Sequence, residues 1–343
     1  GNQKIVTYSD ALKTGIIGAK EIVNSGVLSN GNVGQSVITS YSTASIANSG
    51  TGDITLDPLK ALSIQTVNNT SFDIYGNALT QDILSEFYTI GSGFAFSEYK
   101  AISNNTYDIH SRLTYSEVRN FSDANGTTFR DLQVINYSES DYDQFGNSRL
   151  QTIDTYSSTI IGSGLVDSKK IENVYANLIA ARRGNASTST VTRYSTIQRL
   201  DSDRIDQTIT NTKPEDFDLQ GNALKQQQDK YIFDSTGAKV NTTHSDIVNS
   251  NFDTRGDAGT QTIATYLIDG AIPTLQTYQL FTNRTFDVSR NVVNQLVLTY
   301  ADLAGSTFLD AQEIRSSNFF SSGVAGNQKI VTYSDALKTG IIG

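Results

Sequence analysis

Short stretches of the chain alternate apolar and polar residues with the two-residue period of β-strands. The clearest form is Gln-x-Ile/Val-x-Thr-Tyr, which occurs at residues 3–8, 151–156, 261–266 and 295–300. This period places Gln, Ile or Val and Thr on one face of a strand and the aromatic ring on the other. Both faces therefore mix apolar and polar side chains, and the pattern predicts strands without a dry core on either side.

A turn marker recurs with the strands and divides the chain into units of about 36 residues. It consists of an aromatic residue, Asp, two free positions and then Gly-Asn or a relative of it. The marker stands at residues 72–77, 107–112, 142–147, 217–222, 252–257 and 286–291, and degenerate copies end in Gly1-Asn2, Gly31-Asn32 and Gly184-Asn185. Most marker glycine positions lie 34 to 38 residues apart, so nine units follow one another, and we expect two strands from each.

The marker has the chemistry of a tight hairpin turn. Asp at the first position and Gly at the fourth favour a type I turn, with Gly supplying the positive φ of a G1 bulge. The residues assigned to these turns are Asp73, Gly76, Asp108, Asp143, Gly146, Asp218, Gly221, Asp253, Gly256 and Asp287.

The predicted fold is all-β: repeated antiparallel β-hairpins, roughly 18 strands, forming a long coiled sheet or a hollow tube. The alternative is a β-solenoid with stacked coils. Two short stretches are helix-like, at residues 57–62 and 167–180.

A longer repeat encloses the shorter one. Residues 1–18, GNQKIVTYSDALKTGIIG, recur without a change as residues 326–343. The offset of 325 residues predicts one block of nine units over residues 1–325 and the start of the next identical block at 326–343. The chain contains no Met, so we expect it to be an internal or processed piece of a longer protein.

Composition narrows the class of protein. Hydrophobic residues make up 37% and charged residues 18% of the chain, below the roughly 45–50% and 25% of ordinary globular proteins. A net charge of -9 argues against nucleic acid and anionic membrane surfaces, because both require basic clusters. No apolar stretch is long enough to span a bilayer, so we expect no membrane insertion. The absence of Cys excludes disulfides and thiolate chemistry.

Candidate chemistry is sparse. The two histidines, His110 and His244, lie in a turn marker and in a polar stretch, without a nucleophile motif beside them. The recurring marker aspartates are better explained as turn residues than as catalytic carboxylates. Hard oxygen ligands leave weak calcium candidates at Asp141, Asp143, Asp201 and Asp203. We therefore predict no catalytic residues and no cofactor.

The Tyr/Phe-Asp-x-x-Gly marker followed by an alternating strand resembles the YD repeats of Rhs and Tc-toxin shell proteins. The resemblance covers six markers well and implies long ribbons of β-hairpins. We expect a structural protein that builds an extracellular or cell-surface filament, tube or sheath, whose partners are copies of itself, joined covalently or by edge pairing. The alternatives are an adhesin stalk or binding module, and a β-solenoid glycan-acting enzyme.

Overall fold

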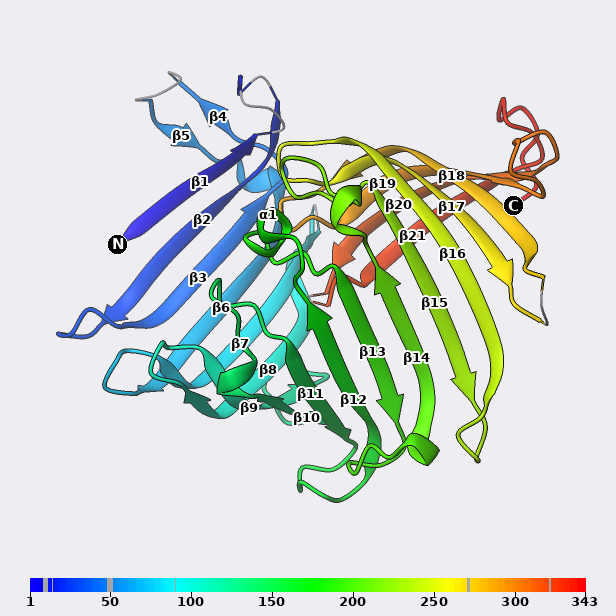
Figure 1. Ribbon diagram of the computed structural model, residues 1–343. Helices are drawn as coiled ribbons and strands as arrows, with labels where there is room; N and C mark the ends of the chain where they lie inside the picture. Colours follow the sequence, from blue (N-terminus) through cyan, green and yellow to red (C-terminus); the bar gives the residue numbers. More distant parts are fainter. Residues whose placement is uncertain (9–11, 14, 48–51, 90, 270–271, 321) are drawn as a thin grey trace. The chain divides into compact units, whose positions relative to one another are not determined.

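The computed structural model of the chain describes all residues except 9–11, 14, 48–51, 90, 270–271 and 321 (Figure 1). Strands account for 61% of the residues and helices for 5%. Nineteen of the 21 strands in the described part belong to an antiparallel sheet in hairpin order, and β4 and β5 form a separate ribbon. The all-β hairpin prediction is confirmed.

Each of the nine units contributes two strands of the sheet. The first strands of the units are β1 (Asn2–Tyr8), β3 (Val33–Tyr41), β7 (Ala78–Thr89), β9 (Leu113–Phe121), β11 (Leu150–Tyr156), β13 (Thr188–Tyr194), β15 (Lys225–Phe233), β17 (Ala258–Leu267) and β19 (Val292–Tyr300). The second strands are β2 (Ile16–Val27), β6 (Ala61–Phe72), β8 (Gly93–Tyr107), β10 (Phe129–Tyr137), β12 (Leu165–Val174), β14 (Arg204–Asn211), β16 (Lys239–Phe252), β18 (Thr274–Phe286) and β20 (Phe308–Phe319). β21 (Ala325–Tyr333) belongs to the second copy of the 18-residue segment.

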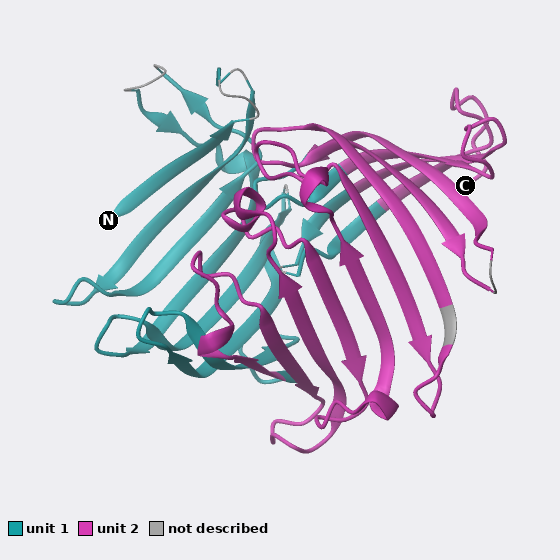
Figure 2. Ribbon diagram, viewed as in Figure 1, with its two compact units in different colours: residues 1–132, 286–293, 316–328 teal, residues 133–285, 294–315, 329–343 magenta. Residues whose placement is uncertain are grey.

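The chain folds into two compact parts (Figure 2). We call them unit 1 and unit 2, and they are distinct from the nine 36-residue units of the sequence. Unit 1 comprises Gly1–Leu132, Phe286–Val293 and Ser316–Gln328, and unit 2 comprises the remaining residues. In unit 1, strands β1, β2, β3, β6, β7, β8 and β9 pair in that order. In unit 2, β11 to β18 pair consecutively, and β19 pairs with β20. All these pairs are antiparallel, which is the arrangement of hairpins and not of the stacked coils of the β-solenoid alternative.

Insertions account for the irregular spacing of the units. Between β3 and β6 lie β4 (Ser45–Ile46), β5 (Ile54–Thr55) and the 3₁₀ turn η1 (Pro58–Lys60), which explain the spacing of 45 residues. The helix α1 (Leu178–Ala181) lengthens another unit, and further 3₁₀ turns are η2 (Glu139–Asp141), η3 (Asp201–Asp203) and η4 (Pro214–Asp216).

The prediction of a helix at residues 167–180 was wrong over most of this stretch. Residues up to Val174 form strand β12, because this stretch pairs with β11 on one side and β13 on the other. The helix begins only after Asn177, whose Oδ1 accepts the backbone N–H groups of Ile179 and Ala180 as an N-cap. At residues 57–62 the only helical part is η1, which Asp57 caps through the N–H of Leu59.

A β-bulge marks the end of most first strands. The pairing register shifts at Tyr8, Tyr41, Tyr156, Tyr194, Phe233, Tyr266 and Tyr300. The aromatic that follows the marker glycine by ten residues occupies this position in five of the seven. A bulge increases local twist and redirects the side chain, and several of these rings become buried: Tyr156 is only 3% exposed.

The interior is small and largely polar. Among the described residues, 17 polar or charged residues are buried, against 15 apolar ones. The one cluster of packed buried apolar residues joins Ala19, Tyr41, Ala44 and Ala61 beside the β4–β5 insertion in unit 1. Hydrogen bonds between hairpins must therefore supply much of the specificity that an apolar core supplies elsewhere.

The marker forms the turn that its residues favour. In the first clear copy, the N–H of Gly76 donates to the carbonyl of Asp73, and the N–H of Asp73 donates to the carbonyl of Asn77. Gly76 has φ +90, the value of the glycine in a G1 bulge. The same two bonds recur at Asp108, Asp143, Asp218, Asp253 and Asp287.

The degenerate marker at Gly1 and its copy Gly326 was misplaced. Gly326 lies inside β21, and the turn before it runs from Phe320 to Val324 with Gly323 at the positive φ. Both glycines belong to the 18-residue segment, so Gly1 stands beside the start of β1 and not in a turn.

Two turn glycines provide a matched test of the marker. Gly146 and Gly221 have φ +84 and +82, but a Cβ on Gly146 would meet open space, whereas one on Gly221 would lie 3.0 Å from the Cα of Ala180. Gly146→Ala should lower the free energy of unfolding by about 1–2 kcal/mol through backbone strain alone. Gly221→Ala should cost at least about 1 kcal/mol more, because the backbone of α1 cannot yield. Equal shifts in urea denaturation would contradict this account.

Candidate functional site: the turn ladder

Each marker aspartate accepts hydrogen bonds from groups of its own turn. Asp143 Oδ1 accepts the N–H groups of Phe145 and Asn147 at 2.8 and 2.9 Å, and its Oδ2 accepts the Asn147 side-chain amide at 2.9 Å. Asp73, Asp218 and Asp287 bind the asparagine four residues on in the same way. Each carboxylate thus closes the loop and fixes the orientation of that asparagine amide.

These hydrogen bonds shift the pKa of several marker aspartates. Burial alone would raise the pKa of Asp143, but the bonds from Asn147 and Phe145 outweigh it and hold the pKa below its ordinary value. The same balance of burial against hydrogen bonds lowers the pKa of Asp73, Asp108 and Asp218. The turns therefore contain carboxylates, which act as hydrogen-bond acceptors and not as proton donors.

Three asparagines at this position contact the turn of the next hairpin, and a marker aspartate orients the first two of them. Asn77 Nδ2 donates to Ser111 Oγ at 3.2 Å, Asn147 Nδ2 to the carbonyl of Ala181 at 2.7 Å, and Asn185 Nδ2 to the carbonyl of Gly221 at 2.9 Å. The two residues of each contact are about one 36-residue unit apart in the sequence. We call this series of contacts the turn ladder.

The turn glycine is also a space requirement of the ladder. A Cβ on Gly76 would lie 2.8 Å from Asn32 Oδ1, and one on Gly323 would lie 3.4 Å from Asn291 Oδ1. A Cβ on Gly256 would overlap Asn222 Oδ1. At Gly76 and Gly256 the amide of one turn lies where a side chain of the next turn would begin, whereas at Gly323 the distance is that of an ordinary contact. Sequence reasoning missed this role, because it explained the glycine by its φ alone.

Arg183 joins three successive turns of unit 2. Its guanidinium donates to the carbonyl of Gln220, to Asn222 Oδ1 and to the carbonyl of Arg255, each at 2.7 Å. The planar fork of arginine suits several acceptors at fixed positions. Nothing in the marker pattern indicated this residue, which lies in the pair Arg182-Arg183 after α1.

In five hairpins a second set of bonds runs from the second strand to the preceding turn. The acceptor is always the carbonyl of the first residue after that turn. The donors and acceptors are Asn69 to Val33, Asn105 to Ala78, Asn173 to Ser148, Asn249 to Ala223 and Arg284 to Ala258, at 2.8 to 3.2 Å. These bonds explain why asparagine recurs near the ends of the second strands.

The calcium candidates form two pairs, Asp141 and Asp143 at η2 and the marker turn that follows it, and Asp201 and Asp203 within η3; each residue is engaged by protein groups. Asp143 binds its own turn, Asp201 pairs with Arg204 at 2.5 Å, and Asp203 accepts the hydroxyl of Thr196. Asp141 ends η2, and its carbonyl accepts the N–H of Arg149. The structure does not bring these four residues together as one ligand set.

His244 lies between two carboxylates on the sheet. Its Nδ1 is 2.8 Å from Asp229 Oδ1 on β15, and its Nε2 is 3.3 Å from Asp246 Oδ1 on its own strand. Burial would lower the pKa of His244, but the two aspartates outweigh burial and raise it. With both ring nitrogens beside an acceptor, the site favours an imidazolium ion. His110 lies in the turn of Asp108, whose Oδ1 accepts its N–H.

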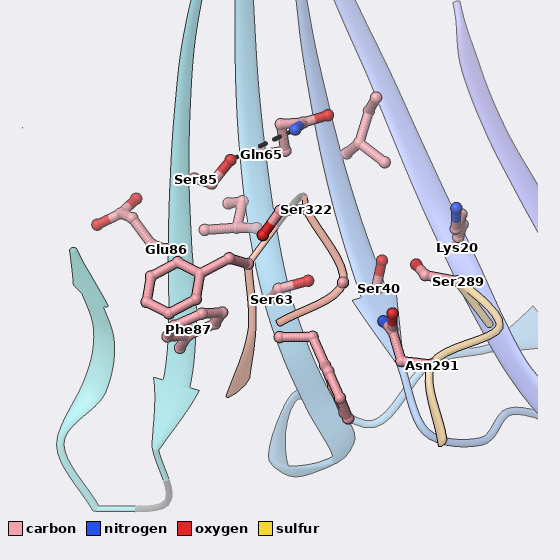
Figure 3. A pocket seen from close by; sticks show the side chains of 15 residues that line it. Lys20, Ser40, Ser63, Gln65, Ser85, Glu86, Phe87, Ser289, Asn291 and Ser322 are labelled. Carbon is pink, nitrogen blue, oxygen red and sulfur yellow. Dashed lines mark hydrogen bonds between the residues drawn. The ribbon is translucent and has the colours of Figure 1, made fainter. Parts of the chain in front are cut away.

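A pocket of about 470 Å³ lies within unit 1 (Figure 3). Strands β2, β3, β6 and β7 provide Lys20, Ser40, Gln65 and Glu86, and the segments 286–293 and 316–328 close it from the other side. The rings of Phe87 and Phe320 meet edge to face with centroids 5.5 Å apart. Serines and amides provide most of the remaining lining.

Comparison with known proteins gives a distant resemblance. No protein-family model and no curated protein matches the chain. The whole chain aligns with 22% of a chain in the crystal structure of TcdB2-TccC3, at 12% identity and a TM-score of 0.22. A Tc holotoxin pore of Photorhabdus luminescens aligns over 96% of this chain and 19% of that one, at 13% identity and a TM-score of 0.18.

The chain thus spans about a fifth of the solved chains that it matches. These neighbours are Tc toxin subunits, as the resemblance of the turn marker led us to expect, but the scores show neither a family nor a shared overall fold. Among the described residues, no helix is long and apolar enough to cross a membrane.

Removal of Arg183 should loosen the turn ladder. Arg183→Ala should lower the free energy of unfolding by about 1 kcal/mol, since three hydrogen bonds are lost from an exposed side chain. Arg182→Ala is the matched control: the neighbouring guanidinium contacts only the ring of Phe145 among the interactions assigned to it, at 5.8 Å. Its cost should be about half or less. Urea denaturation measures both, and an equal or larger loss for Arg182→Ala would refute the role of Arg183.

The charge of His244 should make stability depend on pH near neutrality. Because its folded pKa is raised, its stabilising contribution is complete below the unfolded value of about 6.5 and is lost as pH rises through the folded pKa. The urea concentration at the midpoint of unfolding should therefore decrease as the pH is raised from 6 to 9. His244→Gln should remove most of this slope, and an unchanged slope in that variant would assign the effect elsewhere.

Proposed function

We propose that the chain is a structural repeat of an extracellular or cell-surface filament, tube or sheath, and that it is not an enzyme. The turn ladder is the observation that carries the proposal. The same turn and the same aspartate–asparagine pair recur along the chain, and at several turns an asparagine contacts the next hairpin, so these hairpins act as templates of their neighbours. An arrangement that repeats by translation is suited to extension and has no natural end.

The chemistry of the chain agrees with this role. Its carboxylates are occupied as acceptors within turns, and its one histidine with two aspartate partners is held as a charged group. A chain without Cys and Met is also insensitive to the commonest oxidative lesions, which suits a durable material outside the cell. The partners in this proposal are copies of the 325-residue block, and the net charge of -9 makes nucleic acid an unsuitable one.

A binding module, such as part of an adhesin stalk, is the second candidate. It is favoured by the pocket of unit 1, which combines three phenylalanine rings with hydroxyl, amide and charged groups. Pockets of this size and mixed lining accept small ligands. The pocket lies in unit 1 only, whereas unit 1 and unit 2 each contain contacts of the turn ladder. We therefore prefer the structural role.

Immunogold electron microscopy of the source cells tests the proposal. Antibodies against the purified chain should decorate filaments, tubes or a sheath at regular intervals along their length, because every block carries the same epitopes. Label confined to the tips of surface fibres would favour the binding module. Label on dispersed particles or inside the cells would contradict the structural role.

A further inference from the structure

A row of side chains crosses the floor of the pocket of unit 1. Its members face one another in the pairing registers of β2, β3, β6 and β7, in the order Lys20, Ser40, Ser63 and Phe87. Figure 3 shows Lys20 and Phe87 at the two ends of this row. Three spacings between neighbouring strands make the row about 14 Å long. A ligand that reaches both ends must therefore be longer than one sugar ring.

A second row lies beside the first on the same face of the sheet. Its members are two residues along β3, β6 and β7 from those of the first row, namely Ile38, Gln65 and Ser85. Glu86 alternates with Ser85 and Phe87 along β7, so its carboxylate lies on the opposite face, directed away from the pocket (Figure 3). Among the described residues that line the pocket, only Lys20 then presents a charged group to it.

The polar groups of the first row are open, unlike polar groups elsewhere on the same strands. Beyond the pocket, Gln35 Nε2 on β3 donates to Asn68 Oδ1 on β6 at 2.8 Å. The side chains of Lys20, Ser40 and Ser63 make no hydrogen bond or ion pair with any residue that the structure describes. Polar side chains that gather in a pocket without partners are available to fix the orientation of a ligand.

The opposite wall adds aromatic rings and a rigid turn. Phe320 meets Phe87 edge to face, and Phe319 adds a third ring to the lining. The marker turn 286–291 contributes Ser289 and Asn291, and the side-chain amide of Asn291 is held by the turn aspartate at 2.9 Å. The pocket thus has a cation at one end of its floor, an aromatic ring at the other, and hydroxyl groups between them.

These groups match a ligand that carries one negative charge and several hydroxyl groups along its length. An ammonium group binds a carboxylate or sulfate through charge-assisted hydrogen bonds. Serine hydroxyls both donate and accept, which suits the hydroxyl groups of a sugar. Phenylalanine rings provide apolar surface for the C–H groups of a sugar ring. One lysine without a second cation in the lining balances a single anionic group better than a chain of phosphates.

We propose that this pocket binds an acidic oligosaccharide, with its carboxylate or sulfate at Lys20 and its sugar rings along Ser40 and Ser63 toward Phe87. The inference goes beyond the structural role and rests on the pocket alone. The net charge of -9 disfavours anions in general, so binding depends on the local cation. In a filament or sheath, such a site would hold acidic polysaccharide against the protein.

Isothermal titration calorimetry of the full chain tests the class of ligand. The acidic probes are tetrasaccharides of galacturonate, guluronate, hyaluronan and chondroitin sulfate, and the neutral controls are maltotetraose and cellotetraose. At least one acidic probe should bind at least about tenfold more tightly than either neutral control, because a charge-assisted bond is lost with the charge. Absence of binding by all four acidic probes, or equal binding of a neutral control, would overturn the proposal.

Acetate and inorganic sulfate separate a sugar site from a simple anion site. Both lack the sugar rings that would contact the serines and the phenylalanine rings, so both should bind at least about tenfold more weakly than the best acidic probe. Equal affinity would show an anion site only and would contradict the assignment of an oligosaccharide.

Variants of the pocket test the two ends of the row. Lys20→Gln should weaken binding of the best acidic probe by about tenfold or more. Lys60→Gln is the matched control, because it makes the same change of charge at an exposed lysine of η1 outside the pocket, and its effect should stay within about twofold. Phe87→Leu keeps an apolar side chain but removes the ring, and it should weaken binding by about threefold or more.

Circular dichroism confirms that each variant is folded before its affinity is compared. An equal loss in Lys20→Gln and Lys60→Gln would show that only net charge matters and would refute the site. Unchanged affinity in folded Phe87→Leu would refute the aromatic end of the row. Filaments labelled by antibody without any binding of acidic oligosaccharide would refute this inference and leave the structural role intact.

Discussion

At Gly76, Gly221 and Gly256, the contact between one hairpin and the next occupies the space that a Cβ on the turn glycine would need. The aspartate of a turn orients an asparagine, and its amide oxygen then lies where the next turn would carry a Cβ, as Asn222 does at Gly256. Positive φ and close approach are separate demands, and glycine meets both. Ser111 shows how the demand for free space can be relaxed: its φ remains positive at +60, and its hydroxyl accepts the amide of Asn77. The position thus accepts a side chain where that side chain itself becomes part of the ladder.

Local chemistry made much of the fold predictable from the sequence. Asp73 and Gly76 define a turn that depends on residues adjacent in sequence, and the alternation in 151–156 predicts strand β11. The bulges, the role of Arg183 and the N-cap of α1 could not be predicted in the same way, because each depends on strand register or on atoms about one unit away. The error at Gly1 and Gly326 has the same origin: a Gly-Asn pair fits the marker, but Gly323 forms the turn.

The ladder also explains how so polar a chain adopts a defined fold. Buried Asp, Asn, Ser and Thr are costly unless they are hydrogen-bonded, and once bonded they tolerate few alternatives. Ser168, fully buried, donates to Asp154, which also pairs with Arg199. A slip of one residue would expose such pairs on the wrong face of the sheet. Polar satisfaction therefore fixes the register that apolar packing fixes in proteins with larger cores.

The differences in sequence between successive units have a physical consequence. Joints within a block differ in chemistry: Asn77 meets Ser111, whereas Asn147 meets the last residue of α1 and Arg183 spans two further turns. Different joints oppose a slip by a whole unit, because each hairpin fits its own neighbour best. The order of the units along the chain is thus encoded in the side chains that join neighbouring turns.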